Sequence, residues 1–115
     1  MRAVLVALPL LGLVTPAEAA PMQVVAYSGG FVPSEVYVVR GDTLTLTNVD
    51  TVTHDLVSRQ RRSNGTRLFA SSNVGPAGQG EVYGVSALPA STYPFVCSIH
   101  SYMVGNLTVL AAPVR

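Results

Sequence analysis

The sequence predicts an all-β domain, a Greek-key β-sandwich of about seven to eight strands. Three observations support this fold class. Short runs of β-branched and aromatic residues are separated by glycine, proline and asparagine breaks. Residues 43–47 alternate between threonine and leucine, so that both leucines lie on one face of a strand. From residue 20 onwards, no segment of helical length repeats its apolar residues with the period of a helix.

The first half of the chain contains three predicted strands and one further candidate. Residues 23–27 form the first strand, which ends at a pair of glycines. Residues 35–40 are β-branched and aromatic and form the second strand. A Gly-Asp turn leads to the third strand, residues 43–47, and residues 53–59 are the further candidate. Strands at such short spacing favour a sandwich.

The second half begins with a polar segment and ends with three predicted strands. Residues 61–80 are polar and glycine-rich, so we expect a loop or an irregular edge, in which residues 68–70 are a candidate short strand. Residues 81–86 form the next predicted strand, with its glycine at a bulge. Residues 92–96 and 105–110 form the last two strands, and the apolar residues of the final one share a face.

The N-terminal residues have the organisation of an export signal. Arg2 precedes an apolar stretch over residues 3–14, and Ala-Glu-Ala at residues 17–19 is a cleavage motif. We therefore expect residues 1–19 to be a signal peptide and residues 20–115 to form one mature domain, periplasmic or secreted. The apolar stretch is shorter than the roughly 20 residues that span a bilayer, and no later stretch is long enough, so we expect no membrane span in the mature form.

The low net charge of the chain argues against a nucleic-acid partner. The formal net charge is +1, which lacks the basic footprint of a nucleic-acid-binding protein. All basic residues are arginines, and four of them lie close together: Arg59, Arg61, Arg62 and Arg67. A solvated loop is the simpler interpretation of this cluster, and a docking patch for an acidic partner is the alternative.

Metal binding is favoured by the single cysteine, Cys97. One cysteine cannot form an internal disulfide bond. In the oxidising compartment expected for an exported protein, a lone thiol must pair between molecules, react or bind something. A bound metal ion would protect the thiol.

A candidate metal site consists of His54, Cys97, His100 and Met103, which include both histidines and the only cysteine. His54 follows the strand at 43–47, Cys97 ends a predicted strand, and Met103 precedes the last one, so a Greek-key sandwich can bring these strand ends to one pole. Taken singly, the cysteine could be a buried hydrophobe, the histidine a surface residue and the methionine core filler. Their joint occurrence favours a metal site.

The types of ligand select the metal. Structural zinc usually takes four strong ligands, and a thioether is not a usual one. A binuclear copper centre needs two cysteines. One thiolate, two imidazoles and a weak thioether are the pattern of a mononuclear copper site for electron transfer. Such a site needs neither a substrate pocket nor an open coordination position, so we expect no enzymatic activity.

The ligand residues and their surroundings resemble the cupredoxins, the small blue copper proteins, and most closely the amicyanin and plastocyanin branch. The resemblance runs from about residue 23 to about residue 110 and includes Phe31-Val32-Pro33, Gly41-Asp42-Thr43-Leu44, Asn48-Val49-Asp50, His54, Tyr93, Phe95, Cys97, His100, Met103 and Gly105. Only Ser101 and Tyr102 separate His100 from Met103, as in amicyanins. The resemblance implies that His54, Cys97 and His100 are strong equatorial ligands of one copper ion. It further implies that Met103 is a weak axial ligand and that His100 is the electron port.

Three residues depart from the family pattern. Asp55 stands where asparagine is common, could accept hydrogen bonds from Ser98, and its charge should favour Cu(II). Ile99 replaces a common proline and restores an N–H group that could reach the Cys97 sulfur, which would raise the potential. Val96 stands where plant plastocyanins have tyrosine, so that aromatic exit for electrons is absent.

These residues predict a mobile single-electron carrier that uses one type 1 copper ion. A copper-storage or copper-chaperone protein is the alternative, although such proteins tend to use methionine-rich or multi-cysteine sites. A third hypothesis is a binding or structural sandwich in which Cys97 is inert. The expected partners of a carrier are redox proteins such as a cytochrome c, a dehydrogenase or an oxidase, and we expect the carrier to be a monomer.

Overall fold

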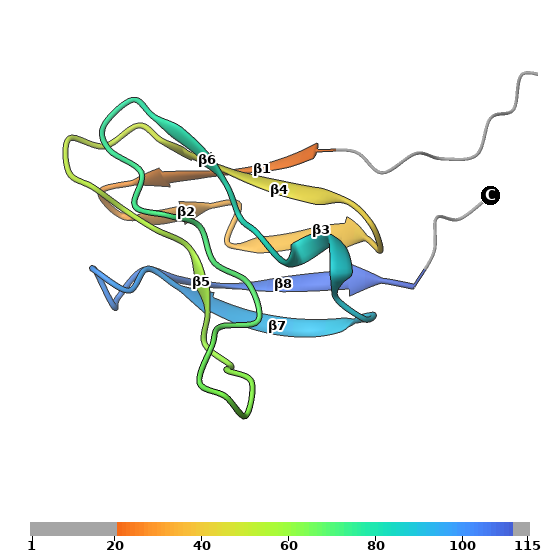
Figure 1. Ribbon diagram of the computed structural model, residues 1–115. Helices are drawn as coiled ribbons and strands as arrows, with labels where there is room; N and C mark the ends of the chain where they lie inside the picture. Colours follow the sequence, from red (N-terminus) through yellow and green to blue (C-terminus); the bar gives the residue numbers. More distant parts are fainter. Residues whose placement is uncertain (1–20, 112–115) are drawn as a thin grey trace, which may run out of the picture.

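The computed structural model describes residues 21–111, which form a two-layered β-sandwich (Figure 1). The strands of this range are β1 (Pro21–Tyr27), β2 (Gly30–Val32), β3 (Glu35–Val39), β4 (Thr43–Asn48), β5 (Val57–Ser58), β6 (Gln79–Glu81), β7 (Ser91–Val96) and β8 (Val104–Leu110). Within the described residues the only helix is a single 3-10 turn, η2 (Val85–Ala87). The all-β prediction is therefore confirmed.

The order of the strands is that of a Greek-key sandwich. One sheet has the order β2-β1-β4-β6 and the other has the order β3-β8-β7-β5. β1 runs parallel to β4 and β3 runs parallel to β8, whereas the other neighbouring strands are antiparallel. Since parallel neighbours cannot be joined by a tight turn, the chain crosses repeatedly between the sheets. As a result the β4–β5 and β7–β8 connections lie at the same end of the sandwich (Figure 1).

The core lies between the two sheets and is built from alternate residues of the strands. Leu44 and Leu46 of β4 are fully buried, as is Leu107 of β8. The rings of Phe31 and Phe95 meet edge to face, with centroids 5.3 Å apart. Each fully buried side chain of this size contributes about 1.5–3 kcal/mol to stability. The alternate apolar residues predicted for 43–47 and 105–110 are therefore the side chains that pack the two sheets against each other.

Most predicted strands are confirmed to within one or two residues. Residues 23–27, 35–40, 43–47, 92–96 and 105–110 correspond to β1, β3, β4, β7 and β8. Strand β2 was not predicted, because the glycine pair Gly29-Gly30 at its start is typical of a break between strands. In the structure Ser28 and Gly29 form the turn, and Gly30 opens β2, which folds back antiparallel to β1.

The strand predicted over residues 81–86 is wrong. Only Glu81 belongs to a strand, β6, and the segment continues through Gly84 into the 3-10 turn. Gly84 has a φ of 97°, and a Cβ atom there would lie 2.6 Å from the carbonyl oxygen of Leu68. This residue therefore reverses the chain beside a neighbouring segment and does not form a bulge.

Residues 53–80 contain less regular strand than the sequence predicts. The candidate strand at 53–59 is reduced to the two residues of β5, and residues 68–70 form no strand. Isolated bridges replace them, for example between Ala70 and both Val57 and Tyr83. The expected loop character of residues 61–80 thus holds up to the start of β6.

The predicted signal peptide, residues 1–19, and its cleavage site lie outside the described residues. Within residues 21–111 there is no helix with the length and apolarity that crossing a membrane requires.

Candidate metal centre

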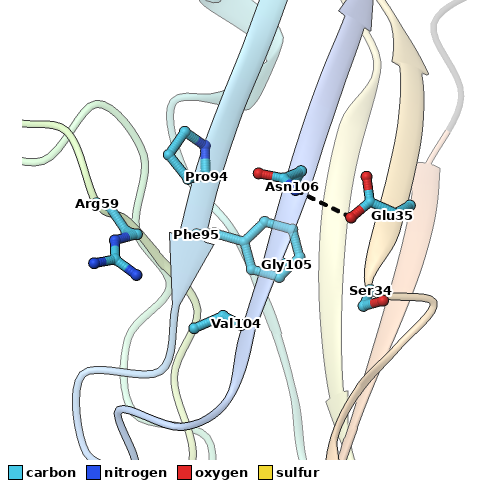
Figure 2. A pocket seen from close by; sticks show the side chains of 8 residues that line it. All are labelled: Ser34, Glu35, Arg59, Pro94, Phe95, Val104, Gly105 and Asn106. Carbon is cyan, nitrogen blue, oxygen red and sulfur yellow. Dashed lines mark hydrogen bonds between the residues drawn. The ribbon is translucent and has the colours of Figure 1, made fainter.

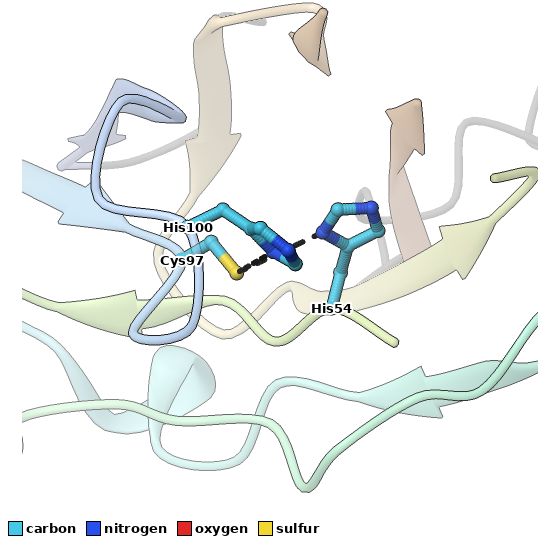
Figure 3. A group of neighbouring side chains, drawn as sticks. All are labelled: His54, Cys97 and His100. Carbon is cyan, nitrogen blue, oxygen red and sulfur yellow. Dashed lines mark hydrogen bonds between the residues drawn. The ribbon is translucent and has the colours of Figure 1, made fainter. Parts of the chain in front are cut away.

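Two connections at one end of the sandwich bring three donor side chains together. His54 lies between β4 and β5, where its backbone N–H donates to the Val74 carbonyl at 3.1 Å and its carbonyl accepts the Val74 N–H at 2.8 Å. Cys97 directly follows β7, and His100 lies in the loop that leads to β8. The three side chains point toward one another (Figure 3).

The spacing of the donor atoms is that of ligands to one ion. The donor atoms of His54, Cys97 and His100 all lie within 4.8 Å of one another. The Cys97 sulfur is 3.8 Å from Nδ1 of His54 and 3.7 Å from Nδ1 of His100 (Figure 3). Metal–nitrogen and metal–sulfur bonds of about 2.0 and 2.3 Å, set about 120° apart, would separate nitrogen and sulfur by roughly 3.7 Å.

The chemistry of the donor set fits one copper ion. A thiolate and two neutral imidazoles suit copper, which accepts both soft and borderline ligands. His54 and Cys97 are fully buried, whereas His100 is partly exposed. A metal held here would thus be shielded from water on the His54 side and would approach the surface only at His100.

Met103, the fourth predicted ligand, closes the loop that carries Cys97 and His100. Its N–H donates to the His100 carbonyl, and its own carbonyl accepts the Cys97 N–H, both at 3.0 Å. Its side chain is fully buried. The backbone of the loop is therefore fixed at the residues whose side chains supply the donors.

Asp50 fixes the orientation of the His54 ring. Its Oδ2 lies 2.8 Å from Nε2 of His54, and its side chain is 13% exposed. The hydrogen bond from His54, and after it the one from the Thr51 N–H, hold the pKa of the Asp50 carboxyl below its ordinary value. Because Nε2 donates its proton to this carboxylate, Nδ1 is left as the unprotonated nitrogen facing Cys97.

Asn48 holds the loop between Asp50 and His54 in place through hydrogen bonds. This fully buried amide donates to the carbonyls of Val52 and Val74, at 2.8 and 2.9 Å, and accepts the Asp50 N–H at 2.8 Å. From the sequence this segment is typical of a turn, and no role was predicted for Asn48 or Asp50. A carboxylate four residues before a candidate histidine ligand is the signal that could have identified Asp50.

Asp55 ties the His54 segment to the Cys97 loop. Its carboxylate accepts the Ser98 N–H at 2.6 Å and the Ser98 hydroxyl at 2.5 Å, as the sequence had suggested. Its own N–H donates to the Cys97 sulfur at 3.5 Å. The sequence left open that the Ile99 N–H could reach the sulfur. Within residues 21–111 no such bond forms, and the sulfur accepts the Asp55 N–H.

Comparison with known proteins identifies relatives of this fold. The family model of the Cupredoxin-like domain matches residues 2–109. A purple cupredoxin from Nitrosopumilus maritimus has a TM-score of 0.62 and 26% sequence identity, covering 76% of this chain and 98% of that one. No curated protein sequence matches the chain.

Amicyanin structures are also similar in fold. A Cu(I) amicyanin variant has a TM-score of 0.64 and 19% identity, covering 77% of this chain and 81% of that one. A second Cu(I) amicyanin variant has a TM-score of 0.64 and 22% identity, covering 81% of this chain and 84% of that one. At such low identity the similarity shows the shared architecture alone.

Replacing Asp50 by Asn should raise the copper reduction potential. The amide oxygen can still accept the hydrogen bond from Nε2 but carries no charge. The His54 imidazole then donates less electron density to the copper ion, and Cu(II) is less stabilised. We expect a rise of about 60 mV, which is a tenfold change for a one-electron couple. The measurement is a spectroscopic redox titration.

Glu81→Gln is the matched control, because it removes an exposed carboxylate from β6. It should leave the potential almost unchanged. Equal shifts in the two variants would show that only net charge matters and would contradict the role given to Asp50.

Proposed function

This chain belongs to the cupredoxin-like domain family, and from that premise we propose that it is a mobile single-electron carrier. It uses one type 1 copper ion that alternates between Cu(I) and Cu(II). In this proposal His54, Cys97 and His100 are the strong ligands and Met103 is the weak axial one. The proposal includes no enzymatic reaction, because electron transfer alone requires no substrate to bind the metal.

The observation that carries this proposal is the position of the Cys97 sulfur at 3.7–3.8 Å from Nδ1 of both histidines. The copper ion would supply the one-electron couple, and the chain would supply a geometry that both oxidation states accept. Asp50 holds the His54 ring, and the Asp55 N–H holds the sulfur. Ligands fixed in this way move little when the charge of the metal changes, so the barrier to electron transfer stays low.

His100 would be the port through which electrons enter and leave. It is the one partly exposed residue of the three donors, and Ile99 and Tyr102 beside it are 46% and 63% exposed. The Tyr102 ring meets the His100 ring edge to face, at 6.2 Å between centroids, and its hydroxyl donates to the Ser28 carbonyl at 3.0 Å. Exposed apolar residues around a metal ligand suit a brief contact with a redox partner.

The burial of the site favours the carrier over a copper-storage or copper-chaperone protein. A protein that hands over its metal needs ligands that can reach the partner. Here His54 and Cys97 have no exposed side-chain surface, and Cys97 is enclosed by the Asp55 segment and its own loop.

We also propose that the protein works outside the cytoplasm. Residues 1–19 would direct export, and residues 20–115 would be the mature domain, periplasmic or secreted. Its partners would be redox proteins such as a cytochrome c, a dehydrogenase or an oxidase, met by a monomeric carrier.

Copper loading tests the proposal directly. The purified protein with Cu(II) should show an intense blue absorption band that disappears on reduction and returns on reoxidation. Replacing Cys97 by Ser should abolish the band, because it arises from charge transfer from the thiolate. A pale or colourless complex of the wild-type protein would contradict the carrier function.

Placing a charge at the port should slow electron exchange. We expect Tyr102→Glu to reduce the rate of electron self-exchange between oxidised and reduced copies about tenfold or more at low ionic strength. Two like charges would face each other when the His100 surfaces of two copies come into contact. The rate is measured from NMR line broadening in mixtures of the two forms.

Tyr83→Glu is the control for this experiment, since Tyr83 has the same 63% exposure but follows β6 and lies outside the ligand loops. If both variants exchange equally slowly, the port is not at His100.

A further inference from the structure

Four arginines form a cationic patch on one segment that follows β5. The arginine patch consists of Arg59, Arg61, Arg62 and Arg67. The segment is a small hairpin, in which Arg61 bridges Arg67 and the Arg62 N–H donates to the Thr66 carbonyl at 2.7 Å. In Figure 1 this hairpin, drawn in yellow-green, projects from the sandwich beside β5 and β7. Its backbone is therefore held by hydrogen bonds, and it carries the four arginines close together.

No carboxylate within the described residues neutralises the arginine patch. The chain has no acidic residue between Asp55 and Glu81, and the carboxylate of Asp55 is buried and bonded to Ser98. Three of the guanidinium groups donate only to backbone carbonyls, those of Ser58, Gly65, Arg67 and Leu68. The guanidinium of Arg59 forms no hydrogen bond or ion pair with any described residue. The patch thus keeps its full positive charge.

The arginine patch adjoins the loop that carries the metal ligands. Arg59 and Arg67 line an open surface depression of about 360 Å³, together with Val96, Cys97, Ser98 and Ser101. Ser98 and Ser101 flank His100 in the same loop. A group bound in this depression would therefore lie against the Cys97–His100 loop.

Arg59 also borders a second depression, of about 290 Å³, on the outer face of β7 and β8 (Figure 2). The one carboxylate there, Glu35, accepts a hydrogen bond from Asn106 at 3.0 Å and lies on the far side of β8 (Figure 2). The free guanidinium of Arg59 hence stands between two depressions and is available to an external anion.

We propose that the arginine patch binds an acidic surface of the redox partner, with carboxylates of that partner pairing with Arg59 and Arg67 at the larger depression. This inference rests on the proposed function. Planar guanidinium groups pair with carboxylates through two parallel hydrogen bonds. The apolar surface at His100 would form the centre of the contact and the arginine patch its charged rim, which steers association and fixes orientation.

The test uses an acidic haem protein as the probe, the reduced soluble domain of cytochrome b5, with the Cu(II) form of the full mature protein. The measurement is the second-order rate constant of copper reduction as a function of ionic strength. We expect Arg59→Glu to lower this rate roughly tenfold at low ionic strength, and by much less at high salt, because steering by charge is screened.

Arg40→Glu is the matched control, because Arg40 is also exposed but follows β3 and donates its N–H to the Leu110 carbonyl, at the other end of the sandwich. It should change the rate by about twofold at most, through net charge alone. Hydroquinone, an uncharged reductant, reports any change in driving force, and its rate should be similar for all three proteins.

Two results would overturn the inference. Equal slowing by the Arg59 and Arg40 substitutions, or no slowing by either while hydroquinone reduces the wild-type protein, would exclude the arginine patch as the docking site and leave the carrier function intact. A wild-type copper protein that hydroquinone cannot reduce would instead contradict the carrier function itself, and the docking proposal with it.

Discussion

The hydrogen bonds of Asp55 join the two halves of the copper site. Its carboxylate accepts both donors of Ser98, and its N–H donates to the Cys97 sulfur, across 42 residues of sequence. A buried carboxylate costs several kcal/mol unless it is fully hydrogen-bonded, and these partners all belong to the Cys97 loop. The folded state therefore requires the two segments to be in contact. Because His54 directly precedes Asp55, the same contact places its ring beside the sulfur, and the bridge to Val74 holds the segment from the other side.

The electrostatic influences on the site oppose one another. The Asp50 carboxylate places a negative charge beside the His54 imidazole and so favours Cu(II). The Asp55 N–H withdraws electron density from the thiolate and so favours Cu(I). The arginine patch adds positive charge at the rim of the site. The potential is thus set by the balance of charges held by hydrogen bonds around the ligands, while the ligands themselves fix only the class of site.

Much of this arrangement could be predicted from the sequence, and the failures have physical causes. The strands were predicted where burial imposes a period of two, as at Leu44 and Leu46. The ligand candidates followed from a small inventory, one cysteine and two histidines. The strand at 81–86 was wrong because Val82 and Val85 both face the core across a Gly84 reversal, which the composition did not reveal. The roles of Asn48 and Asp50, and the donor to the sulfur, depend on which loops meet in space and not on any local pattern.

We infer that the chain holds the copper ligands in one geometry for both oxidation states. X-ray absorption spectroscopy at the copper edge, on one sample poised first as Cu(II) and then as Cu(I), measures the ligands and their bond lengths directly. We expect one sulfur and two nitrogen ligands in both states, with only slight changes in bond length. Loss of a histidine ligand on reduction, or a large lengthening of the copper–sulfur bond, would contradict it.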